Sequence, residues 1–196
     1  TLLALALIRD LGGVETVDAD VATNLYAGLA VDTGGFRHPS TTASALRAGA
    51  LLVERGARAS EITEILLHQR RPEAVALLSR VMGAARYEAD QRIVTLEVSQ
   101  ELLRECGAMT EEAEGLISIA SAIEGVRLAV MFLEGDHGNW RVSLRAHPPW
   151  RVSQIAHDFG GGGHVLAAGF RSPGPLDALR ERVLAAGEEE LARGES

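Results

Sequence analysis

Lysine is absent from this sequence of 196 residues, and all 19 basic residues are arginine. A P-loop lysine, a Schiff-base lysine and a lysine general base are therefore excluded. Cysteine is almost absent as well: Cys106 stands alone, so no internal disulfide can form and a reducing cytoplasm is expected. Any anionic ligand must be recognised by arginine, histidine, backbone N–H groups or a bound metal.

Long apolar runs are also missing. No segment approaches the roughly 20 apolar residues that a membrane helix needs, so we expect no membrane partner. Residues 2–8 are apolar but lack the basic lead-in and the small-residue cleavage site of a signal peptide. With 46% hydrophobic and 23% charged residues, the composition is that of a soluble globular protein of one or two domains.

The net charge of the chain is −8. This balance argues against electrostatic wrapping of long nucleic acid, whose affinity depends on neutralising many phosphates. It is compatible with a small anion held by a few local cations. We therefore expect a short anionic ligand and no long nucleic acid.

Hydrophobic periodicity predicts an α/β fold. Apolar residues at helical spacing predict helices over residues 2–11, 21–27, 43–55, 60–68, 72–85, 101–106, 111–123, 152–158 and 176–193. Short apolar or alternating runs predict strands over residues 28–31, 92–98, 126–133, 140–145 and 169–171. The expected N-caps are Ser40, Thr41 or Thr42 for the helix at 43–55 and Ser60 for the helix at 60–68. The break near Gln69–Pro72 predicts a connection between two units.

Asp32 is the first candidate for chemistry. It follows the predicted buried strand Gly28–Val31 and precedes Thr33-Gly-Gly35. Ligands collect at the carboxyl ends of strands in open α/β sheets, and a carboxylate there can hold a hard divalent cation. An Asx turn or a helix cap explains the same aspartate without any ligand. Arg37 and His38 follow, and either can face the site or remain solvated.

The glycine run Gly160–Gly163 with His164 is the second candidate. Ordering four glycines is entropically costly, and such runs occur where the backbone approaches a ligand or adopts positive φ. Consecutive N–H groups at a helix start bind anions, and His164 can donate to a phosphate or ribose oxygen. A flexible linker fits less well, because apolar residues follow directly. We therefore predict that Gly161, Gly162, Gly163 and His164 bind substrate.

Arg145 closes the predicted strand 140–145. Strand alternation puts Ser143 and Arg145 on one face and Leu144 on the other. An arginine in this place can clamp a phosphate with two hydrogen bonds, whereas a surface arginine on an edge strand is the plainer interpretation. The remaining polar or aromatic candidates carry weaker signals. Glu114 is expected on a solvated helix face, and His137 in an exposed turn. His157 can lie in the core or at the surface, and Trp140 and Trp150 are expected to pack in the interior. Cys106 has no evident base partner, so thiol catalysis is not expected.

These segments together resemble the DHH phosphoesterases. Gly28-Leu-Ala-Val-Asp32-Thr-Gly-Gly-Phe-Arg37 is similar to the last metal-binding motif of that family. Val142-Ser-Leu-Arg145, Ile155–His164 with its glycines, and Ala167-Ala-Gly-Phe170 are similar to the DHH-associated substrate domain. The subgroup it most resembles hydrolyses RNAs of a few nucleotides, the dinucleotide pApA and 3'-phosphoadenosine 5'-phosphate (pAp).

The resemblance implies the C-terminal part of a parallel-sheet DHH domain over residues 1–68, a linker helix over 69–87, and a smaller mixed-sheet α/β substrate domain over 88–196. It implies a metal-dependent phosphoesterase with a two-metal, manganese site, in which Asp32 is a catalytic metal ligand. Arg145, Ser143, Arg37 and the Gly161–His164 loop would hold a short RNA or adenine nucleotide. A homodimer is left open.

The sequence departs from the family in one large respect, because the Asp-His-His motif and the earlier Asp and His ligands are absent. Valine at position 31 and Ala146 replace a common threonine and a common serine. A non-catalytic nucleotide-binding module is therefore one alternative for this chain. A RecJ-like single-strand exonuclease, an inorganic pyrophosphatase and the accessory domain of alanyl-tRNA synthetases are others, each disfavoured by the charge or by a motif.

Overall fold

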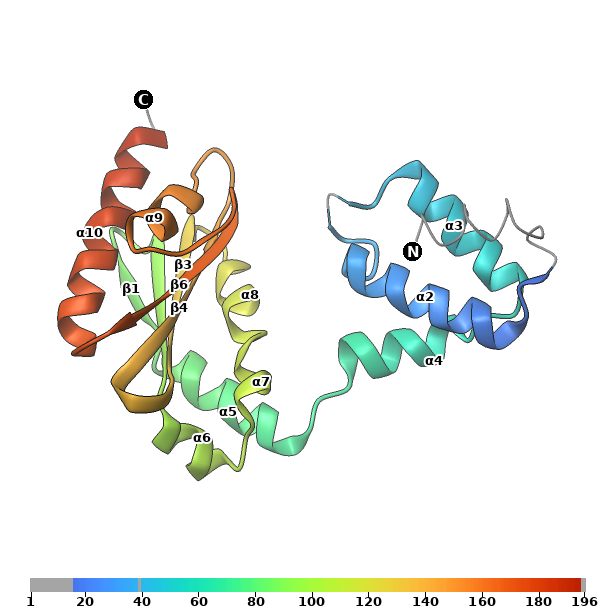
Figure 1. The fold of residues 1–196 in the computed structure, drawn as a ribbon, viewed down its shortest axis with the longest axis horizontal. Helices are drawn as coiled ribbons and strands as arrows, with labels where there is room; N and C mark the ends of the chain where they lie inside the picture. The colour runs from blue at the N-terminus through green and yellow to red at the C-terminus, as the bar shows by residue number, and fades with distance from the viewer. Residues whose placement is uncertain (1–15, 39, 195–196) are drawn as a thin grey trace. The chain divides into compact units, whose positions relative to one another are not determined.

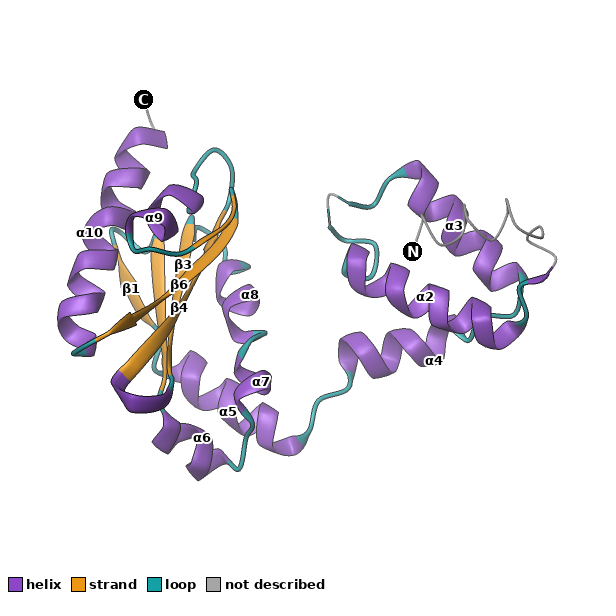
Figure 2. Ribbon diagram, viewed as in Figure 1, coloured by secondary structure: helices purple, strands orange, loops and turns teal. Residues whose placement is uncertain are grey.

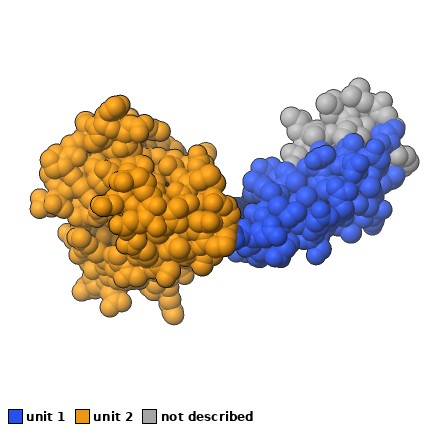
Figure 3. All heavy atoms as spheres, turned by 90° about the horizontal axis from the view of Figure 1, so that it is seen from below, with its two compact units in different colours: residues 1–70 blue, residues 71–196 orange. Residues whose placement is uncertain are grey.

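The computed structural model describes residues 16–38 and 40–194 and divides into two compact units, residues 1–70 and 71–196 (Figures 1 and 3). The predicted helix at 2–11 lies outside the described residues. None of the helices within the described ranges combines the length and apolar character needed to cross a membrane.

The first unit is helical throughout its described part. It contains α2 (Ala19–Thr33), α3 (Ala43–Glu54), α4 (Ala59–Thr63) and a π-helical turn, η2 (Glu64–His68). Thr42 caps α3 as predicted, but the residue before α4 is Arg58, so Ser60 is not an N-cap. Apolar side chains of α2 and α3, among them Leu29 and Leu52, form the core of this unit.

The predicted strand Gly28–Val31 is wrong, because these residues form the second half of helix α2. Asp18 begins the helix by accepting a hydrogen bond from the backbone N–H of Val21 (2.8 Å), and Gly34 ends it in the left-handed conformation (φ 56°). A four-residue run of small apolar side chains fits a buried helix as well as a strand, and here the helix simply continues. Asp32 therefore lies in the last turn of a helix and not at the end of a strand.

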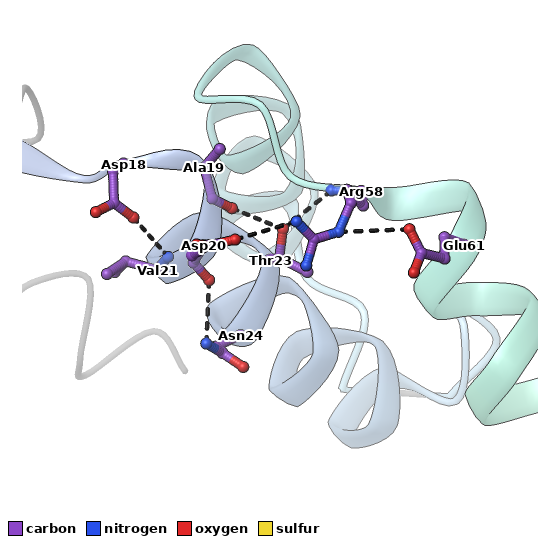
Figure 4. Close-up of polar contacts among 8 residues, drawn as sticks. All are labelled: Asp18, Ala19, Asp20, Val21, Thr23, Asn24, Arg58 and Glu61. Atoms are coloured by element: carbon purple, nitrogen blue, oxygen red, sulfur yellow. Dashed lines mark hydrogen bonds and ion pairs between the residues drawn. The ribbon is translucent and has the colours of Figure 1, made fainter.

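Thr23 fixes α2 to the start of α4 (Figure 4). Its hydroxyl donates to the carbonyl of Ala19 (2.6 Å) and accepts from the backbone N–H of Arg58 (3.2 Å), and the side chain is buried. The ion pair between Arg58 and Asp20 (3.0 Å) lies in solvent. The buried hydroxyl, more than the exposed ion pair, should hold the helix that carries Asp32.

Replacing Thr23 by valine should lower the free energy of unfolding of the first unit by about 1–3 kcal/mol, because the Arg58 N–H loses its acceptor in a buried place. Thr23→Ser keeps the hydroxyl and should cost less. Asp20→Asn removes only an exposed ion pair and should change stability by about 0.5 kcal/mol or less. Thermal unfolding followed by circular dichroism at 222 nm compares the three variants; a Thr23→Val protein as stable as Asp20→Asn would contradict this role.

The second unit is a mixed six-stranded sheet with helices on both faces, which confirms the predicted α/β class (Figure 2). The strands are β1 (Arg86–Glu88), β2 (Ile93–Val98), β3 (Leu128–Glu134), β4 (Asn139–Ala146), β5 (Gly162–His164) and β6 (Ala167–Pro173), in the spatial order β1-β2-β3-β4-β6-β5. Only β2 and β3 run parallel. The strands predicted at 126–133 and 140–145 form a hairpin, in which β3 and β4 pair around a 3₁₀ turn, η3 (Asp136–Gly138).

The helices divide between the two faces of this sheet. One face packs on α9 (Ser153–Asp158) and α10 (Leu176–Gly194), with Phe132, Val142 and Leu144 in the core. The opposite face packs on α5 (Pro72–Gly83), α6 (Gln100–Cys106), α7 (Thr110–Ala113) and α8 (Leu116–Ser121), but the apolar cluster there involves only β2 and β3 among the strands. On that face, the residues of β4, β6 and β5 remain partly exposed. Helix α5, expected as a linker, contributes Leu77 and Val81 to this second core.

Candidate functional site

Asp32 is exposed in the last turn of α2. The unpaired carbonyls at a helix C-terminus carry partial negative charge, so a carboxylate there makes the surroundings more attractive to a cation. The following loop folds back on the helix end: Ser40 Oγ donates to the backbone carbonyl of Asp32 (2.8 Å), and Arg37 Nε donates to the carbonyl of Gly34 (2.9 Å). The loop thus keeps Asp32 and Arg37 at the same end of the helix.

His38 lies against Gly34. A Cβ at Gly34 would fall 2.3 Å from the imidazole Nε2, and the left-handed backbone at this position favours glycine for a second reason. Glycine at this position therefore leaves room for the imidazole ring beside the end of α2. Helix signals alone do not reveal this contact, because it depends on the fold of the loop.

The residues around Asp32 do not complete a metal site by themselves. Within residues 16–38 and 40–194, no three His, Cys, Asp or Glu side chains are grouped as a metal ion would require. Asp32 and His38 offer one carboxylate and one imidazole, fewer donors than a divalent metal normally takes. The predicted two-metal site therefore does not fit the described residues alone.

The predicted substrate residues of the second unit are brought together in one hollow of about 510 Å³. Its lining comes from β4, β5 and β6: Arg141, Val142, Ser143, Arg145, Gly162, Gly163, His164, Ala167, Ala168, Gly169, Phe170 and Arg171. We call it the glycine–histidine pocket. Among the predicted residues Ser143, Arg145, Gly162, Gly163 and His164 line it, whereas Gly161 does not, and Asp32 and Arg37 belong to the other unit.

Strand register explains the shape of the pocket. Arg145 lies opposite Ala167, which in turn lies opposite His164, so one row crosses three strands with only a methyl group between the two polar side chains. The next row runs from Ser143 through Gly169 to Gly162. The floor is therefore almost bare, while Arg145 and Ser143 stand on one side and His164 on the other.

The four glycines of the run have different structural roles. Gly160 adopts φ 76° at the end of α9, and its N–H donates to the carbonyl of His157 (2.9 Å). Gly161 packs so closely on β6 that a Cβ would fall 2.3 Å from the carbonyl oxygen of Gly169. Gly163, at φ 141°, is similarly crowded by Ala168, but Gly162 has open space beside it. Among the four, Gly162 alone has neither a crowded Cβ position nor a left-handed backbone.

The glycine run does not begin a helix. Gly162–His164 is edge strand β5, joined to β6 by a turn at Val165 and Leu166. The carbonyl of Leu166 accepts from the N–H of Ala146 (3.0 Å) and that of Val165 from the N–H of Val152 (2.8 Å), which holds the turn in place. On an antiparallel edge strand every second residue points its backbone N–H away from the sheet, so an anion can still meet such a group.

Arg145 lies on a central strand, so the interpretation as an edge-strand residue is wrong. Burial lowers the pKa of its guanidinium below the ordinary value, and the neighbouring positive charge of Arg141 lowers it further. Its guanidinium donates a hydrogen bond to the carbonyl of the adjacent Leu144 (3.0 Å). A half-buried arginine beside a second arginine is in a place that an anion would stabilise.

Two further arginines of the pocket, Arg141 and Arg171, were not singled out from the sequence. Strand alternation places Arg141 on the face of Ser143 and Arg145, so the signal for it was present. Arg171 is brought alongside only by the pairing of β6 with β4. Glu114, expected on a solvated helix face, forms an ion pair with Arg141 (2.5 Å).

The weaker candidates lie elsewhere. His137 is exposed in the η3 turn and His157 is exposed on α9. Trp140 and Trp150 are buried in the core with α9 and α10, as packing predicts. Cys106 is half-buried at the end of α6.

Comparison with known proteins gives a consistent family. The DHHA1 domain matches residues 90–192. The bifunctional oligoribonuclease and PAP phosphatase NrnA of Thermus thermophilus is 34% identical over 185 residues, which cover 94% of this chain and 55% of the relative. The protein of the same name from Bacillus subtilis is 28% identical over 153 residues, covering 78% of this chain and 48% of the relative.

A solved structure shares the fold. The exopolyphosphatase-related protein from Bacteroides fragilis matches with a TM-score of 0.91 at 20% identity, over 99% of this chain and 57% of that chain. The chain spans about half the length of the curated relatives it matches.

Proposed function

The chain belongs to the DHHA1 domain family, and on that premise we propose that it is the substrate-binding portion of a phosphoesterase acting on short oligoribonucleotides, including pApA, or on pAp. Similar proteins from two bacteria carry the name oligoribonuclease and PAP phosphatase. The single observation that carries the proposal is the glycine–histidine pocket, in which Arg145, Ser143 and His164 surround a bare floor.

The chemistry of the pocket suits a terminal phosphate. The Arg145 guanidinium can donate two parallel hydrogen bonds to phosphate oxygens, and the Ser143 hydroxyl one row away can donate another. His164 stands across Ala167 and can contact a further phosphate or ribose oxygen. The absence of side chains at Gly162 and Gly169 leaves room for the sugar and phosphate against the sheet.

The charge distribution supports a short ligand. The chain carries a net charge of −8, yet no acidic residue is among the described residues that line the pocket, whereas three arginines are. A long polynucleotide would meet mostly negative surface and lose affinity steeply with salt. A short one needs only the pocket, which disfavours a RecJ-like single-strand exonuclease.

Hydrolysis needs an activated water, and we propose manganese for that role with Asp32 as one ligand. Bound to such a site, the metal would supply a hydroxide and stabilise the leaving oxygen. The described residues contribute Asp32 and its loop to this site but not the full ligand set. The incomplete set of metal ligands also supports a second candidate function for the chain on its own, which is nucleotide binding without catalysis.

Binding and turnover of pApA by this chain test the proposal. Calorimetry should show saturable binding with a dissociation constant of about 1 mM or below. AMP release in the presence of manganese should be absent or very slow, because the metal ligands are incomplete. Absence of binding to both pApA and pAp would overturn the proposed function, whereas rapid manganese-dependent release would contradict the binding-only candidate.

A further inference from the structure

Arg141 and Arg171 are neighbours on adjacent strands, on the same face of the sheet. They are directly opposite in the antiparallel pairing of β4 with β6, on the part of the α5–α8 face that stays partly exposed. Cβ atoms of directly opposite residues are about 5 Å apart, and like charges in that arrangement destabilise the sheet. A pair of this kind is unfavourable unless something negative lies between or above the two guanidinium groups.

The protein supplies only part of that negative charge. Glu114, in the segment after α7, forms an ion pair with Arg141 (2.5 Å), with both side chains about half exposed. Within the described part of the chain, Arg171 makes no ion pair or hydrogen bond through its side chain. Arg145, farther along the same face, has no carboxylate partner there either. One carboxylate therefore serves three guanidinium groups in a protein whose net charge is −8.

The arginine pair also joins two hollows. Arg141 and Arg171 line the glycine–histidine pocket and, at the same time, a second hollow of about 280 Å³. The other residues of this second hollow come from the β3–β4 turn and the start of β4: Gly135, Asp136, His137, Asn139 and Trp140. We call it the turn pocket. Its carboxylate, Asp136, lies in the turn, whereas the border with the glycine–histidine pocket is made by the two arginines.

We propose that Arg141 and Arg171 form a second phosphate subsite, which binds the next phosphate of a short oligonucleotide whose terminal phosphate is held at Arg145 and His164. This inference rests on the proposed function, since it extends the same site. It names the preferred substrate class: a strand of at least two nucleotides over a mononucleotide.

Strand geometry separates the two subsites. Arg141 and Arg145 are four residues apart on β4, so their Cα atoms are about 13 Å apart. Ser143 stands between them on the same face, and the bare row through Gly169 and Gly162 leaves the path open. The arginine side chains can reach toward each other over part of this distance, so two successive phosphates can be held at once.

The test measures binding of AMP and of pApA to this chain by calorimetry, for the wild type and for Arg171→Gln. AMP has one phosphate and pApA has two. Arg171→Gln should weaken pApA binding about tenfold, because charge-assisted hydrogen bonds to one phosphate are lost. It should leave AMP binding within about twofold. The slope of log K against log salt for pApA should become shallower by about 0.7, as expected for one lost phosphate contact on a single strand.

Two variants serve as controls. Arg182→Gln removes an exposed arginine from α10, on the other side of the sheet, and should change neither affinity nor the salt slope. Arg171→Lys keeps the charge and should retain most of the pApA affinity and the whole salt slope. Intrinsic fluorescence of Trp140 and Trp150, both in the core of this unit, verifies that each variant is folded.

The outcomes separate the subsite from the function it rests on. Equal weakening of AMP and pApA by Arg171→Gln, or no weakening of either, would overturn the second subsite while the proposed function stands. A wild-type chain that binds neither nucleotide would overturn both.

Discussion

Replacement of Arg145 by methionine should weaken pApA binding about a hundredfold and leave the protein as stable as before or more stable. Two charge-assisted hydrogen bonds to the phosphate are lost, each contributing about 1.5 kcal/mol or more. The free energy of unfolding, in contrast, should stay the same or rise. The pKa of Arg145 is lowered by burial and then by Arg141, so the charged form is less favourable in the folded state than in the unfolded chain.

The sign of this stability effect follows from linkage. A base whose pKa is lowered on folding destabilises the folded state at every pH at which it is protonated in both states, and arginine is protonated in both at neutral pH. Methionine removes that charge and keeps much of the apolar length of the side chain. Thermal unfolding by tryptophan fluorescence gives the stability, and calorimetry with pApA gives the affinity.

Two companion variants make the result specific. Arg145→Lys keeps the charge but not the planar pair of donors, so it should recover only part of the affinity. His164→Ala, across the pocket floor, should weaken binding about tenfold, since a single hydrogen bond is lost. A methionine variant that loses stability and affinity together would mean that Arg145 is a structural residue, and unchanged affinity in His164→Ala would remove that histidine from the site.

Alanine in place of Gly163 should destabilise the second unit by about 3 kcal/mol, whereas alanine in place of Gly162 should leave its stability within about 1 kcal/mol. At Gly163 the backbone is at φ 141°, and a Cβ would fall 2.6 Å from the Cα of Ala168 and 2.7 Å from the carbonyl oxygen of Ala167. These are backbone atoms of the paired strand and cannot move aside. At Gly162 no atom lies within 4 Å of the added Cβ.

The two variants therefore separate an effect on folding, expected for Gly163→Ala, from an effect on binding, expected for Gly162→Ala. Gly162→Ala should fold normally but bind pApA more weakly, because its methyl group rises from the pocket floor beside Gly169. Denaturant unfolding followed by tryptophan fluorescence reports this unit, as both tryptophans belong to its core. Similar unfolding midpoints for the two variants would contradict the crowding at Gly163, and unchanged pApA affinity in Gly162→Ala would place the ligand elsewhere.

Local signals predicted much of the second unit. Alternation along residues 140–145 correctly put Ser143 and Arg145 on one face of the strand and Leu144, which is buried, on the other. The proline at position 72 correctly marked the start of α5. These features depend on side-chain periodicity and on the fixed φ of proline, which neighbouring residues alone determine.

The structure of the first unit was harder to predict, because one short segment is compatible with both a helix and a strand. Gly28–Val31 was interpreted as a strand, although the Asp18 cap and the left-handed Gly34 enclose it in one helix. Four small apolar residues carry no period that distinguishes the two structures. The motif at residues 28–37 still makes Asp32 a candidate, but the residue lies at the end of a helix and not at the end of a strand.

The full composition of the pocket could not be predicted, because it depends on register between distant strands. Arg171 meets Arg141, and Gly162 meets Gly169, only through the pairings of β6 with β4 and β5. A shift of one residue would turn Arg171 to the core face. Sequence alone identified five of the residues that line the pocket, among them Arg145 and His164, but not how they meet.

The position of β4 inside the sheet has a consequence for the entropy of binding. Its backbone is hydrogen-bonded to β3 on one side and to β6 on the other over nearly its whole length, and the core with α9 and α10 supports it from below. A ligand therefore meets a backbone that is already ordered. The rotamers of the pocket side chains, the arginines foremost, remain to be fixed, at about 1 kcal/mol each. The floor of the pocket is thus organised in advance, and the adaptable part of recognition lies in the guanidinium groups that reach over it.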